Sequence, residues 1–164
     1  MKNICLIGMP GSGKSTVGVV LAKRLCMKFI DSDLLIQERT GKALNKIISE
    51  SGIDGFNKIE EEVNSCIEGD DQIIATGGSV IYGQKAMEHL KEISTVIYLK
   101  HSLAEISKRV GDLRDRGVAI RDGQTLDILY DERVPLYEKY ADIVIDCEFK
   151  NIRDIVLEIA DMFE

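Results

Sequence analysis

The feature that most constrains this chain is a glycine-rich segment near its start. Residues 8–15 read Gly-Met-Pro-Gly-Ser-Gly-Lys-Ser and match the phosphate-loop pattern G-x-x-x-x-G-K-[ST] in full. An apolar run over residues 3–7 indicates a buried strand before the loop, and a helical pattern over residues 15–25 follows it. This order places backbone N–H groups at the positive end of a helix, where they bind phosphate oxygens. The alternative, a turn without a ligand, gives no reason for a lysine beside a hydroxyl in this register.

Six consecutive residues of this loop are therefore expected to bind a nucleotide: Gly11, Ser12, Gly13, Lys14, Ser15 and Thr16. The glycines let the backbone curl so that successive N–H groups point inward. Lys14 would place a positive charge against the β- and γ-phosphates, and the Ser15 hydroxyl would be a ligand of Mg²⁺. The loop thus predicts a nucleotide with a γ-phosphate, bound together with Mg²⁺.

Strand-like runs alternate with helical patterns along the rest of the chain, which is typical of a parallel sheet covered by helices on both faces. The runs are residues 4–7, 29–30, 72–75, 95–99 and 143–145. We expect an α/β fold of three layers (α/β/α) with a parallel five-stranded sheet in a single domain, residues 1–164. Residues 34–69 lack a strand signal and indicate about three short helices separated by Gly41, Gly52 and Gly55. This helical insertion would form one wall of the ligand site above the phosphate loop.

Composition and charge exclude several classes of protein. Of the 164 residues, 45% are hydrophobic and 30% charged, and no apolar stretch approaches the length of a membrane span. The net charge of -7 argues against a broad nucleic-acid surface. Met1 and Lys2 lead directly into the first strand, which leaves no room for a signal peptide. We therefore expect a cytoplasmic protein, a monomer, with a small anionic ligand and neither a nucleic-acid nor a membrane partner.

The cysteines and histidines give no metal or redox signal. The four cysteines, at positions 5, 26, 66 and 147, show no C-x-x-C spacing, and we interpret them as small buried hydrophobic residues rather than disulfides or zinc ligands. His89 and His101 have no nearby partner of metal-binding or triad type, so we expect both at solvated helix or loop positions.

A second unusual segment, residues 111–123, contains three glycines and three arginines. Flexible joints beside arginines are typical of a lid that closes over a polyphosphate and brings positive charge to the transferred group. The alternative is a solvated charged loop, because three aspartates in the same segment offset the arginines. The neighbouring phosphate loop favours the lid.

The second strand is followed by Asp31-Ser32-Asp33. Carboxylates at the carboxyl end of a strand beside the phosphate loop lie within reach of both Mg²⁺ and an acceptor hydroxyl. Asp31 would hold the hydrated metal, and Asp33 would accept the proton of the hydroxyl or orient it. Helix capping is the alternative for one of the two, since Asp and Ser also favour the position before a helix.

Taken together, these motifs resemble shikimate kinase in their order and spacing, from residue 3 to about residue 146. The shared motifs are the loop at residues 8–16, Phe-Ile-Asp-Ser-Asp at 29–33, Gly41 and Gly52, Phe56 with Glu60, Ala-Thr-Gly-Gly at 75–78 and Arg-Val-Pro-Leu-Tyr at 133–137. The resemblance implies a P-loop kinase fold similar to that of nucleoside-monophosphate kinases. It also implies transfer of the γ-phosphate of ATP to the 3-hydroxyl of shikimate.

Residue by residue, the resemblance implies roles on both sides of the reaction. Asp33 would contact the acceptor hydroxyls, and Gly78 would offer its backbone N–H near the γ-phosphate and the substrate; an ordinary turn at the end of a strand is the alternative for Gly78. Arg133 would bind the carboxylate of shikimate, for which a planar guanidinium is suited; a surface arginine paired with Asp131 or Glu132 is the alternative. Arg116 would reach the phosphates from the lid, and Arg109 would stack on the adenine. Lys14, Asp33 and Arg116 would be the catalytic residues.

Three positions depart from the family pattern, all on the acceptor side. Asn57 stands where the pattern has an arginine that binds the acceptor carboxylate, Ser79 stands where it has a glycine, and Ile53 where it has an acidic residue. We keep Asn57 as a candidate acceptor-binding residue. Two alternatives therefore stay open: a relative that phosphorylates another small hydroxy acid or polyol, and a nucleotide-binding regulatory relative without catalysis, against which Asp33 and Arg116 argue.

Overall fold

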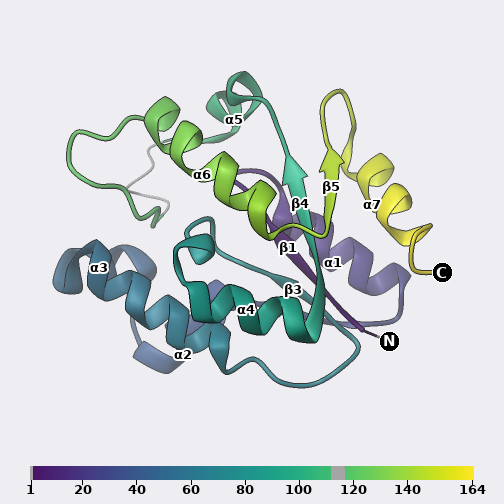
Figure 1. Cartoon of the computed structure of the whole chain (residues 1–164), viewed down its shortest axis with the longest axis horizontal. Coiled ribbons are helices and arrows are strands. Elements are labelled where there is room, and N and C mark those ends of the chain that lie inside the picture. Colours follow the sequence, from purple (N-terminus) through teal and green to yellow (C-terminus); the bar gives the residue numbers. More distant parts are fainter. Residues whose placement is uncertain (1, 112–116) are drawn as a thin grey trace.

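The protein has a five-stranded parallel sheet in the order β2-β3-β1-β4-β5 (Figure 1). The computed structural model describes residues 2–111 and 117–164. The strands are β1 (Asn3–Ile7), β2 (Lys28–Asp31), β3 (Gln72–Ala75), β4 (Ser94–Lys100) and β5 (Ile143–Asp146). Each of the five expected runs falls within one of these strands or coincides with it. The expected α/β fold with a parallel five-stranded sheet is therefore confirmed.

Alternating side chains of the strands pack on opposite faces of the sheet. On one face, Cys5 and Ile7 pack with side chains of α4 (Gln84–Ile93) and α6 (Leu126–Tyr140). On the other face, Ile4 and Leu6 pack with α1 (Lys14–Arg24) and α7 (Ile152–Ala160). The strand β1 is buried along its whole length because both of its faces are covered. Figure 1 shows the resulting layers, with α4 and α6 in front of the sheet.

The helical insertion follows β2 and consists of α2 (Ser32–Thr40) and α3 (Leu44–Ser65). Gly41 ends α2 with a φ of 67°, and Gly52 kinks α3 with a φ of 71°; both values lie in the left-handed region that favours glycine. Gly55, in contrast, continues the helix, so only two of the three expected glycine breaks occur. A small separate hydrophobic core stabilises the insertion. It consists of Ile36, Ile47, Phe56 and Val63, together with Ala119 from the segment before α6.

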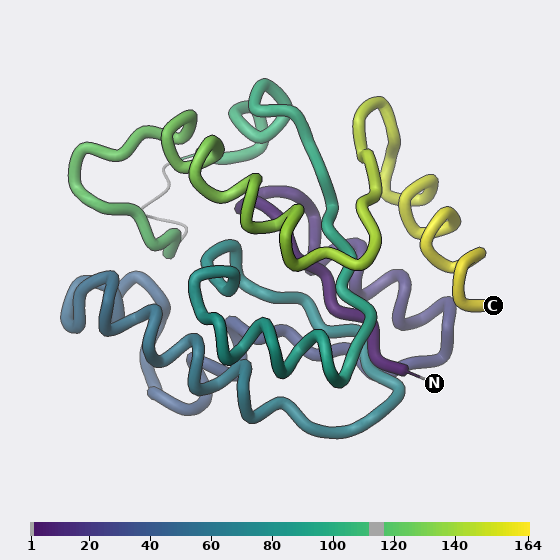
Figure 2. The backbone as a smooth tube through the Cα atoms, viewed as in Figure 1, coloured from purple at the N-terminus to yellow at the C-terminus, as the bar shows by residue number. Residues whose placement is uncertain are grey.

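The segment before α6 lies against this insertion, as the tube in Figure 2 shows. Its described part, Gly111 and residues 117–123, contains neither helix nor strand. Gly117 lies so close to α3 that a Cβ built on it would be 2.8 Å from the Cβ of Leu44. Arg121 donates to Asp54 of α3 at 2.9 Å. Arg116 lies outside the described residues, so its role in a lid stays a prediction.

Two expectations about minor residue types are wrong. Cys26 and Cys66 are exposed, whereas Cys5 and Cys147 are buried as expected. Both exposed cysteines follow the end of a helix, α1 and α3 respectively, where the chain turns at the surface. His101 is only 2% exposed instead of solvated. Among the helices that the structure describes, none is long and apolar enough to cross a membrane.

Candidate active site

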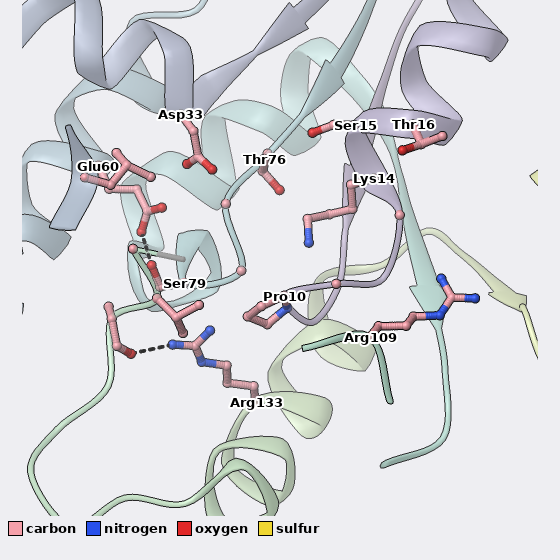
Figure 3. A pocket seen from close by; sticks show the side chains of 18 of the residues that line it. Pro10, Lys14, Ser15, Thr16, Asp33, Glu60, Thr76, Ser79, Arg109 and Arg133 are labelled. Atoms are coloured by element: carbon pink, nitrogen blue, oxygen red, sulfur yellow. Dashed lines mark hydrogen bonds between the residues drawn. The ribbon is translucent and has the colours of Figure 1, made fainter. Parts of the chain in front are cut away.

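A cavity of about 550 Å³ opens at the carboxyl ends of the strands, between the phosphate loop, the insertion and α6 (Figure 3). Its lining draws on the turns after β1, β2 and β3, because parallel strands end at the same edge of the sheet. The lining includes many of the predicted residues: Gly11, Gly13, Lys14, Ser15, Thr16, Asp33, Gly78, Arg109 and Arg133. Glu60, Thr76, Gly77 and Ser79 line it as well.

The phosphate loop presents Lys14 to this cavity. Gly11 and Gly13 have φ values of 76° and 88°, which lets the loop curl around its centre. The Lys14 ammonium donates to the carbonyl oxygens of Gly8 at 2.8 Å and Met9 at 2.9 Å, and to Ser12 Oγ at 3.3 Å. Burial lowers the pKa of Lys14 to about 8. A desolvated cation inside a ring of backbone dipoles is suited to binding a polyanion.

His101 forms a hydrogen bond with the backbone of the phosphate loop, a contact that the sequence analysis did not predict. It directly follows β4, and its Nε2–H donates to the carbonyl oxygen of Ser12 at 2.9 Å. The Tyr130 hydroxyl of α6 donates to the carbonyl of His101 at 2.7 Å. Burial lowers the pKa of His101, so the neutral ring with its proton on Nε2 is the form that fits the contact. The sequence held no local signal for this contact, which joins residues 89 positions apart in the chain.

Asp31 caps α2 and also contacts the second predicted metal ligand. Its Oδ1 accepts from the backbone N–H of Asp33 at 2.9 Å and so caps α2. Its Oδ2 accepts from the Ser15 hydroxyl at 3.1 Å. The two predicted metal ligands therefore lie side by side. Their hard oxygen atoms fit Mg²⁺, which is commonly held by one or two carboxylates while water and substrate phosphates complete its shell.

Two carboxyl groups face the acceptor half of the cavity, the half-buried Asp33 and the buried Glu60. Burial, with a further contribution from Asp31, raises the pKa of Asp33 to about 6. Glu60 of α3 is 2% exposed, and burial raises its pKa to about 7. The Ser79 hydroxyl donates to Glu60 Oε1 at 2.6 Å. Both carboxyls therefore lie in a desolvated environment in which each hydrogen bond from a ligand counts strongly.

Arg133 enters the same half from α6 and is 1% exposed, which contradicts the alternative of a surface arginine. Its Nη2 donates to the carbonyl oxygen of Ala119 at 2.8 Å, and its guanidinium carbon lies 5.4 Å from the centre of the Tyr82 ring. Gly78 lies beside it: a Cβ at this position would be 3.0 Å from Arg133 Nη1 and 3.0 Å from Pro10 Cδ. Glycine is thus the residue that fits between the arginine and the phosphate loop.

Two further predicted residues lie differently from the rest. Asn57 is half-buried and is not among the residues that line the cavity; within the described chain its Oδ1 has no hydrogen-bond partner. Arg109 lines the far end of the cavity, where its Nε donates to Glu105 at 2.9 Å, and Figure 3 shows its guanidinium pointing away from Lys14. The roles of both residues stay predictions.

Comparison with known proteins agrees with this geometry. The sequence profile of one family, shikimate kinase, matches residues 10–164. The chain belongs to the shikimate kinase family. A shikimate kinase of Haemophilus influenzae (strain PittEE) is 35% identical over 167 residues, which cover 99% of this chain and 93% of that protein. The family resemblance inferred from the motifs is therefore confirmed over nearly the whole chain.

Solved structures show the same relation. Shikimate kinase from Acinetobacter baumannii, in complex with shikimate, superposes with a TM-score of 0.87 at 30% identity and covers 99% of this chain and 92% of its own. Thymidylate kinase from Candida albicans superposes with a TM-score of 0.61 at 15% identity, covering 98% of this chain and 90% of its own. The latter likeness concerns the fold alone. It confirms the expectation that shikimate kinases and nucleoside-monophosphate kinases share one architecture.

Proposed function

We propose that the protein transfers the γ-phosphoryl group of ATP to the 3-hydroxyl of shikimate, giving ADP and shikimate 3-phosphate. One observation carries this proposal beyond membership of the family. A single cavity joins the phosphate loop with Lys14 to the half-buried Asp33 and the buried Arg133. A polyanion at one end and a hydroxylated carboxylate at the other would meet within this cavity, which is the arrangement that in-line transfer needs.

On the nucleotide side, the N–H groups of residues 11–16 would bind the phosphates and Lys14 would stabilise the charge that develops during transfer. Arg116 would add a second positive charge from the lid, and Arg109 would stack on the adenine. Ser15 and Asp31 would hold Mg²⁺, which neutralises charge on the β- and γ-phosphates when bound.

On the acceptor side, Arg133 would bind the carboxylate of shikimate, and the N–H of Gly78 would lie near the transferred group. Asp33 would orient the attacking hydroxyl and take its proton as the new P–O bond forms and the bond to the ADP oxygen breaks. Because one chain supplies every one of these groups, we propose that the enzyme acts as a monomer. We propose the cytoplasm as its location.

One observation favours a second candidate function. The uncharged Asn57 in α3 provides both a hydrogen-bond donor and an acceptor where a carboxylate-binding arginine is expected. Another small hydroxy acid, or a polyol with a neutral polar group at this place, would suit it. The complete set of Lys14, Asp33 and Arg133 argues against the further alternative of a nucleotide-binding regulatory protein without catalysis.

The deciding experiment measures ADP release with shikimate, gluconate and a panel of small polyols, with identification of the phosphorylated product. The expected result is a kcat/KM for shikimate that exceeds that for the other acceptors. A larger kcat/KM for a neutral polyol would assign the second function instead. Nucleotide binding without turnover of any acceptor would favour the regulatory role.

A further inference from the structure

The buried guanidinium of Arg133 is contacted by neutral groups. The side chain is 1% exposed, and Nη2 donates to the carbonyl oxygen of Ala119 at 2.8 Å. The guanidinium carbon lies over the ring of Tyr82, 5.4 Å from the ring centre. Within the described chain, Nε has no hydrogen-bond partner. A buried cation with so few partners depends on each of them for its stability and its orientation.

Tyr82 belongs to η1 (Val80–Tyr82), a short 3₁₀ helix close after β3. A cation within about 6 Å of the centre of an aromatic ring is attracted to the negative face of the ring, and the attraction is larger when the cation is desolvated. Arg133 meets both conditions. Tyr82 is not among the residues that line the cavity, so its effect on a ligand bound there would pass through Arg133.

The hydroxyl of Tyr82 engages the carboxylate that precedes Arg133 in the chain. It donates to Glu132 Oε1, and the side-chain amide of Gln124 donates to Glu132 Oε2 at 3.4 Å. Burial and the hydrogen bond to Glu132 raise the pKa of Tyr82, so the hydroxyl keeps its proton near neutral pH and can donate. Neutral donors thus occupy both oxygens of Glu132, and the charge of Arg133 stays available for a ligand.

We infer that Tyr82 is a positioning residue for Arg133. Its ring holds the guanidinium in the orientation that binds the carboxylate of the acceptor, and its hydrogen bond to Glu132 holds the ring in place. The residue would contact neither the acceptor nor the nucleotide. This inference rests on the proposed function, because it takes Arg133 to bind the carboxylate of shikimate.

The test removes the ring and the hydroxyl separately. Tyr82→Leu removes both and should raise the KM for shikimate about five- to tenfold, because a guanidinium that has left its orientation must be ordered again by the acceptor. Tyr82→Phe keeps the ring and should recover most of this loss. In both variants the KM for ATP should be unchanged and kcat should change less than the KM for shikimate, since Tyr82 lies away from the nucleotide and the reacting atoms.

A control variant and a neutral ligand separate this role from a general effect on structure. Tyr140→Leu is the matched control, because Tyr140 also lies on α6 and its ring centre is 5.1 Å from the ammonium of Lys139, outside the cavity lining. Its KM for shikimate should equal that of wild type. The carboxamide of shikimate, used as a competitive inhibitor, offers no negative charge to Arg133. Its inhibition constant should be similar for wild type and Tyr82→Leu.

The outcomes distinguish the inference from the proposed function. The inference is overturned if Tyr82→Leu leaves the KM for shikimate unchanged, if it weakens the carboxamide as much as shikimate, or if Tyr82→Phe is equally impaired. If wild type does not phosphorylate shikimate, the proposed function fails, and the same series is measured with the carboxylic acid that it does phosphorylate. A preference for a neutral polyol would contradict both.

Folding of the variants is measured by urea unfolding. Tyr82 is 36% exposed, so we expect Tyr82→Leu to fold. If it does not, Tyr82→Met replaces it, because methionine also lacks the ring and fills irregular space more readily.

Discussion

Several ionisable side chains of this site are buried. Lys14 is 8% exposed, Glu60 2% and Arg133 1%. Burial of an ionised group costs free energy unless partners compensate it. The Lys14 ammonium has three hydrogen-bond acceptors in the protein. Within the described chain, in contrast, Glu60 Oε2 and Arg133 Nε have no hydrogen-bond partner. Such unmatched groups are typical of sites in which a ligand supplies the missing contacts.

Lys14 gives the first prediction at this scale. Lys14→Ala removes the charge directed at the β- and γ-phosphates, so turnover should fall by at least about a hundredfold. The backbone N–H groups of the loop remain, and some ADP affinity should therefore persist. Steady-state turnover and calorimetric ADP binding check both parts. A variant with normal turnover would be incompatible with the proposed function.

His101 gives a second prediction. Replacement by alanine leaves the buried carbonyl of Ser12 without its donor, which should destabilise the protein by about 1–3 kcal/mol and raise the KM for ATP. His101→Gln retains an N–H donor and should recover part of both losses. Urea unfolding and ATP kinetics measure the effects. Equal behaviour of the alanine variant and wild type would show that this hydrogen bond does not position the loop.

At the scale of elements, the turn after β3 connects the two halves of the site. At Gly77 its backbone lies close to the carboxyl groups of Asp33 and Glu60, and at Gly78 it lies close to Pro10 and Arg133. The segment before α6 contributes similarly, because Ala119 places its side chain in the core of the insertion and offers its carbonyl to Arg133. The position of Arg133 is therefore linked to the packing of this segment against the insertion.

Glycines in two elements give a matched prediction. In Gly77→Ala the new methyl group would press on both carboxyl oxygens, so the KM for shikimate should rise more than tenfold while ADP binding stays unchanged. Gly41→Ala has open space around it but a φ of 67°, so it should cost about 1 kcal/mol of stability and leave the KM unchanged. Kinetics and denaturant unfolding of both variants provide the comparison. Equal KM values in the two variants would contradict the close approach at Gly77.

At the scale of the whole molecule, Glu60 also affects stability. Its pKa rises from an ordinary 4.5 to about 7 on folding, so the folded state holds this proton more tightly than the unfolded chain. Wild type should therefore lose about 3 kcal/mol of stability as the pH rises through this interval. Glu60→Gln has no carboxyl group to ionise at this position and therefore does not lose this stability. The variant should exceed wild type in unfolding free energy at pH 8, by much less at pH 5, and the exposed Glu62→Gln should show no such trend.

The architecture could be predicted from the sequence because the spacing of apolar residues shows which side of each helix or strand is buried. The loop residues and the Asp31–Asp33 cluster could be predicted as well, since a glycine-rich turn with a lysine, or paired carboxylates directly after a buried strand, seldom occur away from a ligand site. His101 and the partnership of Glu60 with Ser79 could not. Their roles depend on contacts between residues 89 and 19 positions apart in the chain, and no local pattern distinguishes such a histidine or glutamate from a solvated one.

The order of the strands has a consequence for how the family diversifies. Under the proposed function, the turns after β2 and β3 would serve the acceptor and those after β1 and β4 the nucleotide, so the two tasks would occupy opposite ends of one sheet edge. Ile53, Asn57 and Ser79 all belong to the insertion or to the turn after β3. A few replacements at one end would then change the preferred alcohol without altering the residues that are proposed to bind ATP at the other end.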